Sequence, residues 1–219
     1  REIGRSLRDR MSADFWRIAN QSIPRLDDNW AQSVLSASNL MIDRFSALSG
    51  LAAENMARGP AWRFYDLGRR IERALTICRI ARQLTAEDCG PDEYGLLLDL
   101  FDSQITYRSR YLVGAMRAPV IDLILLDSGN PRGLTYQVER MAEHIASLPQ
   151  LSEDGIPEAP YRQFSAMLAS LRAMECEAVG DGQLQDIETR LLALSDAISQ
   201  RYFLQYERSD PPVRDSLLG

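Results

Sequence analysis

The chain has 219 residues, of which 45% are hydrophobic and 26% charged, and its formal net charge is −6. This is the composition of an ordinary globular protein with one or two domains. An acidic chain lacks the basic surface that dominates nucleic-acid affinity, which excludes general nucleic-acid binding. The apolar run 120–126 is too short to span a bilayer, so no membrane protein is expected.

The basic and sulfur-containing residues give two further indications. All 25 basic residues are arginine, which pairs with carboxylates and phosphates through two parallel hydrogen bonds better than lysine does. A genome biased toward arginine codons explains the same composition. The three cysteines, Cys78, Cys89 and Cys176, lie far apart and lack a Cys-x-x-Cys spacing. We therefore expect reduced thiols in a cytoplasmic protein, with no disulfide or zinc framework.

The first half of the chain predicts helices joined by short links. Apolar residues at helical spacing predict helices over 1–20 and 30–48, with Gly50 following the end of the second as a C-cap. A short helical link is expected over 51–58. Gly59 and Pro60 then begin a central helix, which we expect to end near Glu87.

The second half predicts more helices and one ambiguous segment. A single helix is expected over 93–112, apolar around most of its circumference. Residues 119–127 fit a buried strand or a short helix, and helix is preferred because no other strand candidate exists to pair with it. A further helix is expected from Pro131 to about Leu148, then a loop, then two long amphipathic helices over 161–178 and 184–206.

Together these segments predict an all-α fold. We expect a single-domain bundle of about seven or eight helices, without a sheet, over residues 1–206, and a loose tail over 207–219. The last pair, within 161–206, is expected to form a hairpin packed on the rest. Its role, and the oligomeric state, do not follow from the sequence.

The central helix carries charges on a face that the sequence predicts to be covered. Asp66, Arg69 and Arg73 share this face with Trp62, and one turn later it becomes apolar, with Ile77. A helix that is apolar on both sides is typical of a buried central helix. Its charges therefore point into the protein or into a cleft, where they must be paired.

Three polar groups are the candidates for a site. They are Asp66, Arg69, Arg70, Glu72 and Arg73, with Trp62 beside them; Asp102, Ser103, Thr106, Tyr107, Arg108 and Arg110; and Asp127, Asn130 and Arg132. One interpretation is a buried ion-pair network that holds the helices together. The other is a cleft whose arginines hold a carboxylate or phosphate, with Glu72 or Asp102 as general acid or base.

Other chemistry finds little support in the sequence. There is no Gly-rich phosphate loop, and one histidine, His144, gives neither a multi-histidine metal site nor a Glu-x-x-His motif. We therefore expect no metal and no cofactor. His144 lies in an amphipathic helix and is interpreted as a structural or surface residue.

Several motifs together resemble the alpha-E family of bacterial α-helical domains, which is named for a recurrent Glu-Arg pair. The resemblance covers residues 1 to about 149, and Glu72-Arg73 matches the Glu-Arg pair. The matching segments are Ser-Leu-Arg-Asp-Arg-Met-Ser at 6–12 followed by Trp16, Glu54-Asn55-Met56-Ala57-Arg58, 62–74, 102–111 and 123–132. The family usually opens with an earlier helix that carries a first Gly-Arg-x-x-Glu-Arg copy, and this chain begins after it.

The resemblance implies an all-α, cytoplasmic bacterial protein associated with a circularly permuted ATP-grasp ligase and often with a transglutaminase-like peptidase. The leading hypothesis is a non-catalytic accessory domain of that ligase system, which holds an acidic or peptide substrate in an arginine-rich cleft. One alternative is a stand-alone enzyme that uses Glu72 or Asp102 on the ligase product. The other is a purely structural module, in which every charge is paired and loss of Glu72 would cost roughly 3–5 kcal/mol.

Overall fold

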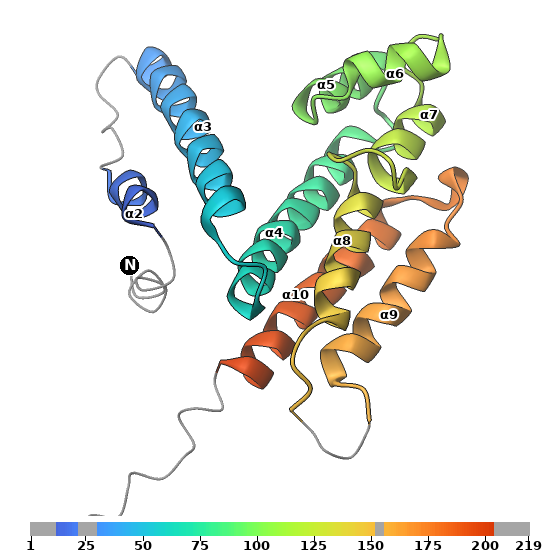
Figure 1. The fold of residues 1–219 in the computed structure, drawn as a ribbon. Helices are drawn as coiled ribbons and strands as arrows, with labels where there is room; N and C mark the ends of the chain where they lie inside the picture. Colours follow the sequence, from blue (N-terminus) through green and yellow to red (C-terminus); the bar gives the residue numbers. More distant parts are fainter. Residues whose placement is uncertain (1–11, 22–29, 152–155, 204–219) are drawn as a thin grey trace, which may run out of the picture. The chain divides into compact units, whose positions relative to one another are not determined.

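The computed structural model describes residues 12–21, 30–151 and 156–203, and in these ranges every regular element is a helix. The all-α fold class is therefore confirmed. The chain divides into two compact units, Arg1–Tyr65 and Asp66–Gly219, with the division inside the helix that the sequence predicts to be central. Figure 1 shows the helices in chain order.

The first unit contains α2 (Ala13–Ala19), α3 (Trp30–Asn55) and the start of α4 (Pro60–Leu84). Ser12 caps α2 by accepting a hydrogen bond from the backbone N–H of Phe15 at 3.2 Å. The expected stop at Gly50 is wrong, because α3 runs through this glycine to Asn55. A glycine in a helix interior costs only about 1 kcal/mol, and the helix-forming residues after it continue the turn. Residues 1–11 of the first expected helix lie outside the described residues.

In the second unit, the expected helix over 93–112 is wrong in one respect, because the chain forms two helices there. These are α5 (Pro91–Leu100) and α6 (Gln104–Tyr111). Asp102 between them adopts a left-handed backbone with φ 49°, a conformation that aspartate tolerates better than most residues. The buried Ser103 hydroxyl donates to the Phe101 carbonyl at 2.9 Å and fixes the turn. Apolar periodicity continues through this break, so it could not reveal it.

The ambiguous segment over 119–127 is helical, as expected. It consists of α7 (Arg117–Ile121) followed by a π-helix over Asp122–Leu126. Val120, Ile121, Leu123, Ile124 and Leu125 are all buried. Burial on nearly every side explains why the sequence shows neither strand nor helix periodicity here.

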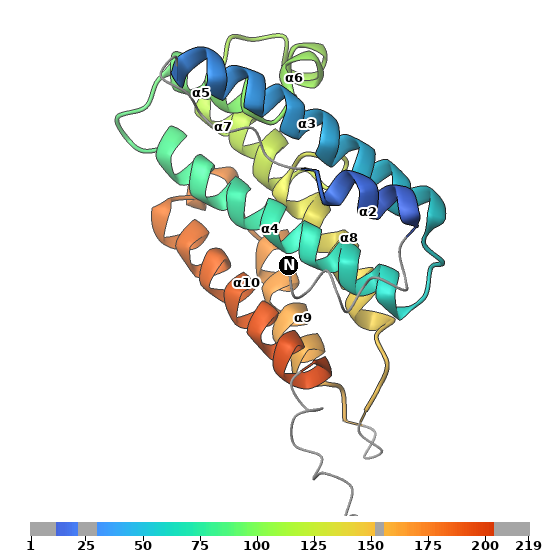
Figure 2. The ribbon, with the colours of Figure 1, turned by 90° about the vertical axis from the view of Figure 1, so that its left-hand side faces the viewer.

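Three more α-helices complete the second unit: α8 (Leu134–Ala146), α9 (Ala159–Arg172) and α10 (Asp181–Tyr202), with a short 3-10 turn at Cys176–Ala178. Helix α9 contacts both α8 and α10, as Figure 1 shows. In Figure 2, α10 runs alongside α4, and Arg79 of α4 pairs with Glu188 of α10 at 2.6 Å.

The core of the second unit lies between α4, α5, the π-helix and α8. Ile77, Leu98, Ile124 and Val138, one from each of these elements, have no exposed surface. Helix α4 is buried on more than one side, since Asp66 and Leu67 are adjacent and each is only 1% exposed. Adjacent residues lie about 100° apart around a helix. This burial encloses Asp66 and partly covers Arg69, Arg70 and Arg73, whereas Glu72 is exposed.

Candidate functional site

A buried carboxylate, Asp66, organises the polar residues between α4 and α8. Its side chain is 2% exposed, and it accepts hydrogen bonds from Arg69 and Arg70 of its own helix at 2.5 and 2.6 Å. The Nε2 atom of His144, on α8, lies 2.7 Å from Asp66 Oδ2, the oxygen that also accepts from Arg70. The i, i+3 and i, i+4 spacings place both arginines beside Asp66 on the helix surface.

The environment of Asp66 favours the ionised form. Burial alone would raise the pKa of this carboxyl, but the hydrogen bonds from His144, Arg69 and Arg70 outweigh burial and hold the pKa well below its usual range. Asp66 is therefore a permanent negative charge that fixes two guanidinium groups and one imidazole. It is not a group that exchanges a proton near neutral pH.

More guanidinium groups gather around Asp66 than this carboxylate can neutralise. We call the set the arginine cluster: Arg69, Arg70, Arg73, Arg132 and Arg140. Burial, and then the like charges of Arg69, Arg132 and Arg70, lower the pKa of Arg73. Among the described residues, Arg73 has no hydrogen bond or ion pair. The negative charge of Asp66 acts in the opposite direction. The half-buried guanidinium of Arg73 thus lies among positive charges and has no direct ion pair with a described residue.

Helix α8 supplies the other wall of the arginine cluster. The Arg70 guanidinium donates from Nη1 to Gln137 Oε1 at 3.1 Å. The ring of Tyr136 lies near two guanidinium groups, with Arg70 5.9 Å and Arg140 5.6 Å from the ring centre, within the range of cation–π attraction. Gln137, Arg140 and His144 follow an i, i+3, i+7 spacing, which places them on one helix face.

These α8 residues are absent from the sequence-based candidates. His144 belongs to the network around Asp66, and Tyr136, Gln137 and Arg140 line the same cluster. Two signals were available in the sequence. One is their helical spacing, and the other is Glu139-Arg140, a second Glu-Arg pair in an apolar setting like that of Glu72-Arg73.

Of the first candidate group, the structure joins Asp66, Arg69, Arg70 and Arg73 but does not bring Glu72 to them. The Glu72 side chain is exposed, on a different side of α4 from Arg73. Within the described residues, only the backbone carbonyl of Glu72 has a hydrogen-bond partner outside the regular helix bonds, the Thr76 hydroxyl at 2.8 Å. Trp62 lies in the first unit, where Arg58 stacks over its ring at 4.0 Å.

We expect Glu72→Gln to change the free energy of unfolding by no more than about 0.5 kcal/mol, because an exposed side chain without an ion pair contributes little. Urea denaturation of the two proteins measures this difference. A loss of 3 kcal/mol or more would show that Glu72 is a buried ion-pair partner and would contradict its exposed position.

The second candidate group serves local structure or faces solvent. Tyr107 is 2% exposed, and its hydroxyl donates to the Gly114 carbonyl at 2.9 Å and accepts from the Met116 N–H at 3.2 Å. Thr106, Arg108 and Asp102 are exposed. Neither proposed general acid or base, Glu72 or Asp102, therefore lies in an enclosed pocket.

The third candidate group lies in the loop before α8, and its members have different partners. Asn130 is buried and holds three partners: it donates to Ser103 Oγ and the Leu123 carbonyl, and it accepts from the Arg132 N–H. Arg132 contacts the exposed Asp102 at 3.5 Å. Asp127 pairs with Arg110 at 2.7 Å. Asn130 thus positions the backbone of Arg132, whereas Asp127 and Arg110 form a separate pair.

Two properties of the described residues bear on metals and membranes. No group of three or more His, Cys, Asp and Glu side chains within them is arranged to hold a metal ion. No helix in this part of the chain is long and apolar enough to cross a membrane.

Comparison with known proteins gives relatives and a family. The chain is 29% identical over 202 residues to the uncharacterized protein Mb2597 of Mycobacterium bovis, and 28% identical over 201 residues to the uncharacterized protein Rv2567 of Mycobacterium tuberculosis. Each match covers 86% of this chain but only 23% of the relative, so the chain spans about a quarter of their length. No solved structure matches. The model of the Alpha-E family, a predicted alpha-helical domain with a conserved ER motif, matches residues 1–203, and the chain therefore belongs to this family.

Proposed function

We propose that this domain is a non-catalytic accessory domain of an ATP-grasp peptide or amide ligase system, and that its arginine cluster holds an oxyanion of an acidic or peptide substrate. The single observation that supports the binding role is Arg73, a half-buried guanidinium beside Arg69, Arg70 and Arg132 that forms no ion pair with any described residue. A carboxylate or phosphate placed there would relieve the repulsion and form charge-assisted hydrogen bonds.

The geometry favours this role over the alternatives. A purely structural module accounts for Asp66, whose partners are all internal, but it leaves Arg73 unexplained. A stand-alone enzyme that uses Glu72 or Asp102 finds both carboxylates exposed. A fixed anion and a row of permanently charged arginines suit binding and orientation better than proton transfer.

The ligase context is the part of the proposal that rests on the family. In this proposal the partner is a circularly permuted ATP-grasp protein, with a transglutaminase-like peptidase as a possible third component, and the complex works in the cytoplasm. The three cysteines in the described residues are free, with Cys78 fully buried, which agrees with a reducing compartment. The matched relative is much longer than this chain, which covers 23% of it. The remaining length leaves room for further domains fused to this one, as the proposal requires.

The test measures ATP hydrolysis by a circularly permuted ATP-grasp protein from the same organism, with a pool of acidic peptides, in the presence and absence of this protein. We expect stimulated turnover that Arg73→Gln reduces at least tenfold. Arg172→Gln is the matched control, because Arg172 is an exposed arginine that pairs with Glu139 outside the cluster. Unchanged turnover, together with separate elution of the two proteins on size exclusion, would refute the accessory role.

A further inference from the structure

The chain carries two Glu-Arg pairs in matching positions on two neighbouring helices of the second unit. In α4 the pair Glu72-Arg73 lies between buried Ile71 and Ala74, and in α8 the pair Glu139-Arg140 lies between buried Val138 and Met141. Because the flanking residues point into the core, the Glu and Arg side chains of each pair point away from the core on opposite sides of the helix.

The two pairs divide their charges in the same way. Arg73 joins Arg69, Arg70 and Arg132, and Arg140 shares the Tyr136 ring with Arg70. The glutamates leave the arginine cluster: Glu72 is exposed, and Glu139 pairs with Arg172 of α9 at 2.8 Å. Arg73 and Arg140 are therefore corresponding arms of one cluster, one contributed by each helix.

Each arm has hydrogen-bond donors that the protein itself does not use. Within the described residues, the buried Nε atoms of Arg69 and Arg140 have no hydrogen-bond partner. Arg73 has no polar partner there either. A buried donor without an acceptor costs about 1–3 kcal/mol, so unused donors on both arms indicate that an acceptor from a ligand belongs at each.

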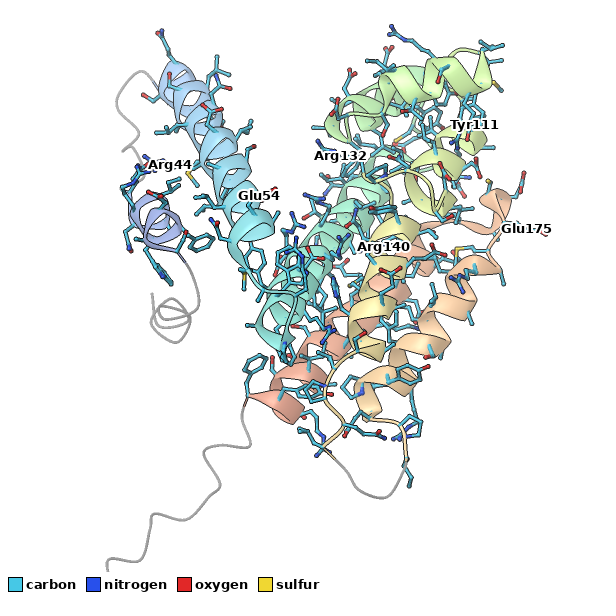
Figure 3. The ribbon with its side chains drawn as sticks, viewed as in Figure 1. Arg44, Glu54, Tyr111, Arg132, Arg140 and Glu175 are labelled. Carbon is cyan, nitrogen blue, oxygen red and sulfur yellow. The ribbon has the colours of Figure 1, made fainter. Side chains whose placement is uncertain are left out.

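The two arms are separate in space. Arg140 lies within α8, about 9 Å along the helix axis from its first residue, Leu134, whereas Arg132, beside the Arg73 arm, lies in the loop that precedes the helix. Figure 3 shows Arg132 and Arg140 at different heights on this side of the second unit.

The charge balance agrees with two ligand charges. Four of the five guanidinium groups of the arginine cluster pair with carboxylates. Arg69 and Arg70 pair with Asp66, Arg132 with Asp102 at 3.5 Å, and Arg140 with Glu143 at 2.7 Å, and only Asp66 of these carboxylates is buried. Counting all three carboxylates as full partners leaves a surplus of two positive charges. One small monoanion cannot neutralise two charges or reach both arms.

The geometry points to a ligand with two separated carboxylates, one held by Arg73 with Arg69 and the other by Arg140, such as the acidic side chain and the terminal carboxylate of a peptide. This inference rests on the proposed binding role and defines its substrate class. Asp66 contributes by fixing Arg69 and Arg70 before the ligand arrives, which lowers the ordering cost of binding. Tyr136, whose ring lies near both Arg70 and Arg140, offers an aromatic surface for the part of the ligand that joins the two carboxylates.

Isothermal titration calorimetry at low salt tests this inference with acetate, inorganic phosphate and the series succinate, glutarate and adipate. We expect the best dicarboxylate to bind at least tenfold more tightly than acetate, and more tightly than phosphate, whose charges sit on one group. Arg73→Gln and Arg140→Gln should each lower its affinity to that of acetate. The control Arg172→Gln should bind like the unmodified protein.

The outcomes separate this inference from the broader proposal. Phosphate binding as tightly as the dicarboxylates, or Arg140→Gln leaving their affinity unchanged, would overturn the two-armed site while Arg73-dependent anion binding still stands. No binding of any of these anions would overturn both. If Arg140→Gln fails to fold by circular dichroism, Arg140→Lys takes its place, because it keeps the charge but loses the planar fork and should still weaken dicarboxylate binding.

Discussion

Replacing Asp66 with asparagine is expected to lower the free energy of unfolding by about 3–5 kcal/mol, the usual cost of removing one partner from a buried ion pair. The asparagine would leave Arg69, Arg70 and His144 around a neutral amide, next to the already unpaired Arg73. Urea denaturation followed by circular dichroism measures the loss.

A second Asp–Arg pair in the chain provides the matched control. Asp186 and Arg190 of α10 also lie at i, i+4, at 2.8 Å, but both side chains are about half exposed. Asp186→Asn should therefore cost less than about 1 kcal/mol. Equal losses for Asp66→Asn and Asp186→Asn would contradict the central position of Asp66.

The effect of Asp66→Asn should depend on pH in a defined direction. Because the folded protein holds the pKa of Asp66 below the unfolded value of about 3.9, the stabilisation by its charge is complete above that value and declines as the pH falls. The difference between Asp66 and asparagine should thus be full near pH 6 and shrink between about pH 5 and pH 3. Measuring both in a His144→Gln background leaves Asp66 as the varied acidic group at this contact. A difference that grows on acidification would contradict the assigned cause.

Replacing Asn130 with alanine is expected to cost about 3 kcal/mol. Asn130 is 6% exposed and makes three hydrogen bonds, at 3.2 Å to Ser103 Oγ, 2.9 Å to the Leu123 carbonyl and 3.1 Å from the Arg132 N–H. Each such bond contributes about 1 kcal/mol, and polar groups left buried without a partner add to the loss. Thermal and urea denaturation report the change.

Thr106→Ala is the control for Asn130→Ala, since the sequence offers both residues as site candidates but the structure exposes Thr106 at the surface of α6. Its effect should stay within about 0.5 kcal/mol. An Asn130→Ala protein as stable as the Thr106→Ala protein would show that the turn between α5 and α6 does not depend on Asn130. In that case Asn130 would be free for a direct role in binding.

The sequence by itself determined the all-α fold, most helix positions and the importance of the start of α4. Apolar spacing at 3.6 residues marks helices because core burial repeats with the helical turn. The same pattern placed Asp66, Arg69 and Arg73 on a covered face, where the structure finds Asp66 buried. Spacing also predicted the contacts of Asp66 with Arg69 and Arg70, because neighbours within one helix depend on sequence distance alone.

Only the tertiary structure decided which residues pack against α4 and which of its charged side chains are exposed or covered. His144 reaches Asp66 across 78 positions of sequence, and Gln137 reaches Arg70 across 67; no periodicity within one helix contains such pairings. The turn at Asp102 splits an apolar stretch into α5 and α6, because buried hydrogen bonds of Ser103 and Asn130 outweigh local helix preference. Glu72 and Arg73 are adjacent in sequence, yet one is exposed and the other belongs to the arginine cluster. A step of about 100° around a helix separates solvent from interior only once neighbouring helices have covered one side.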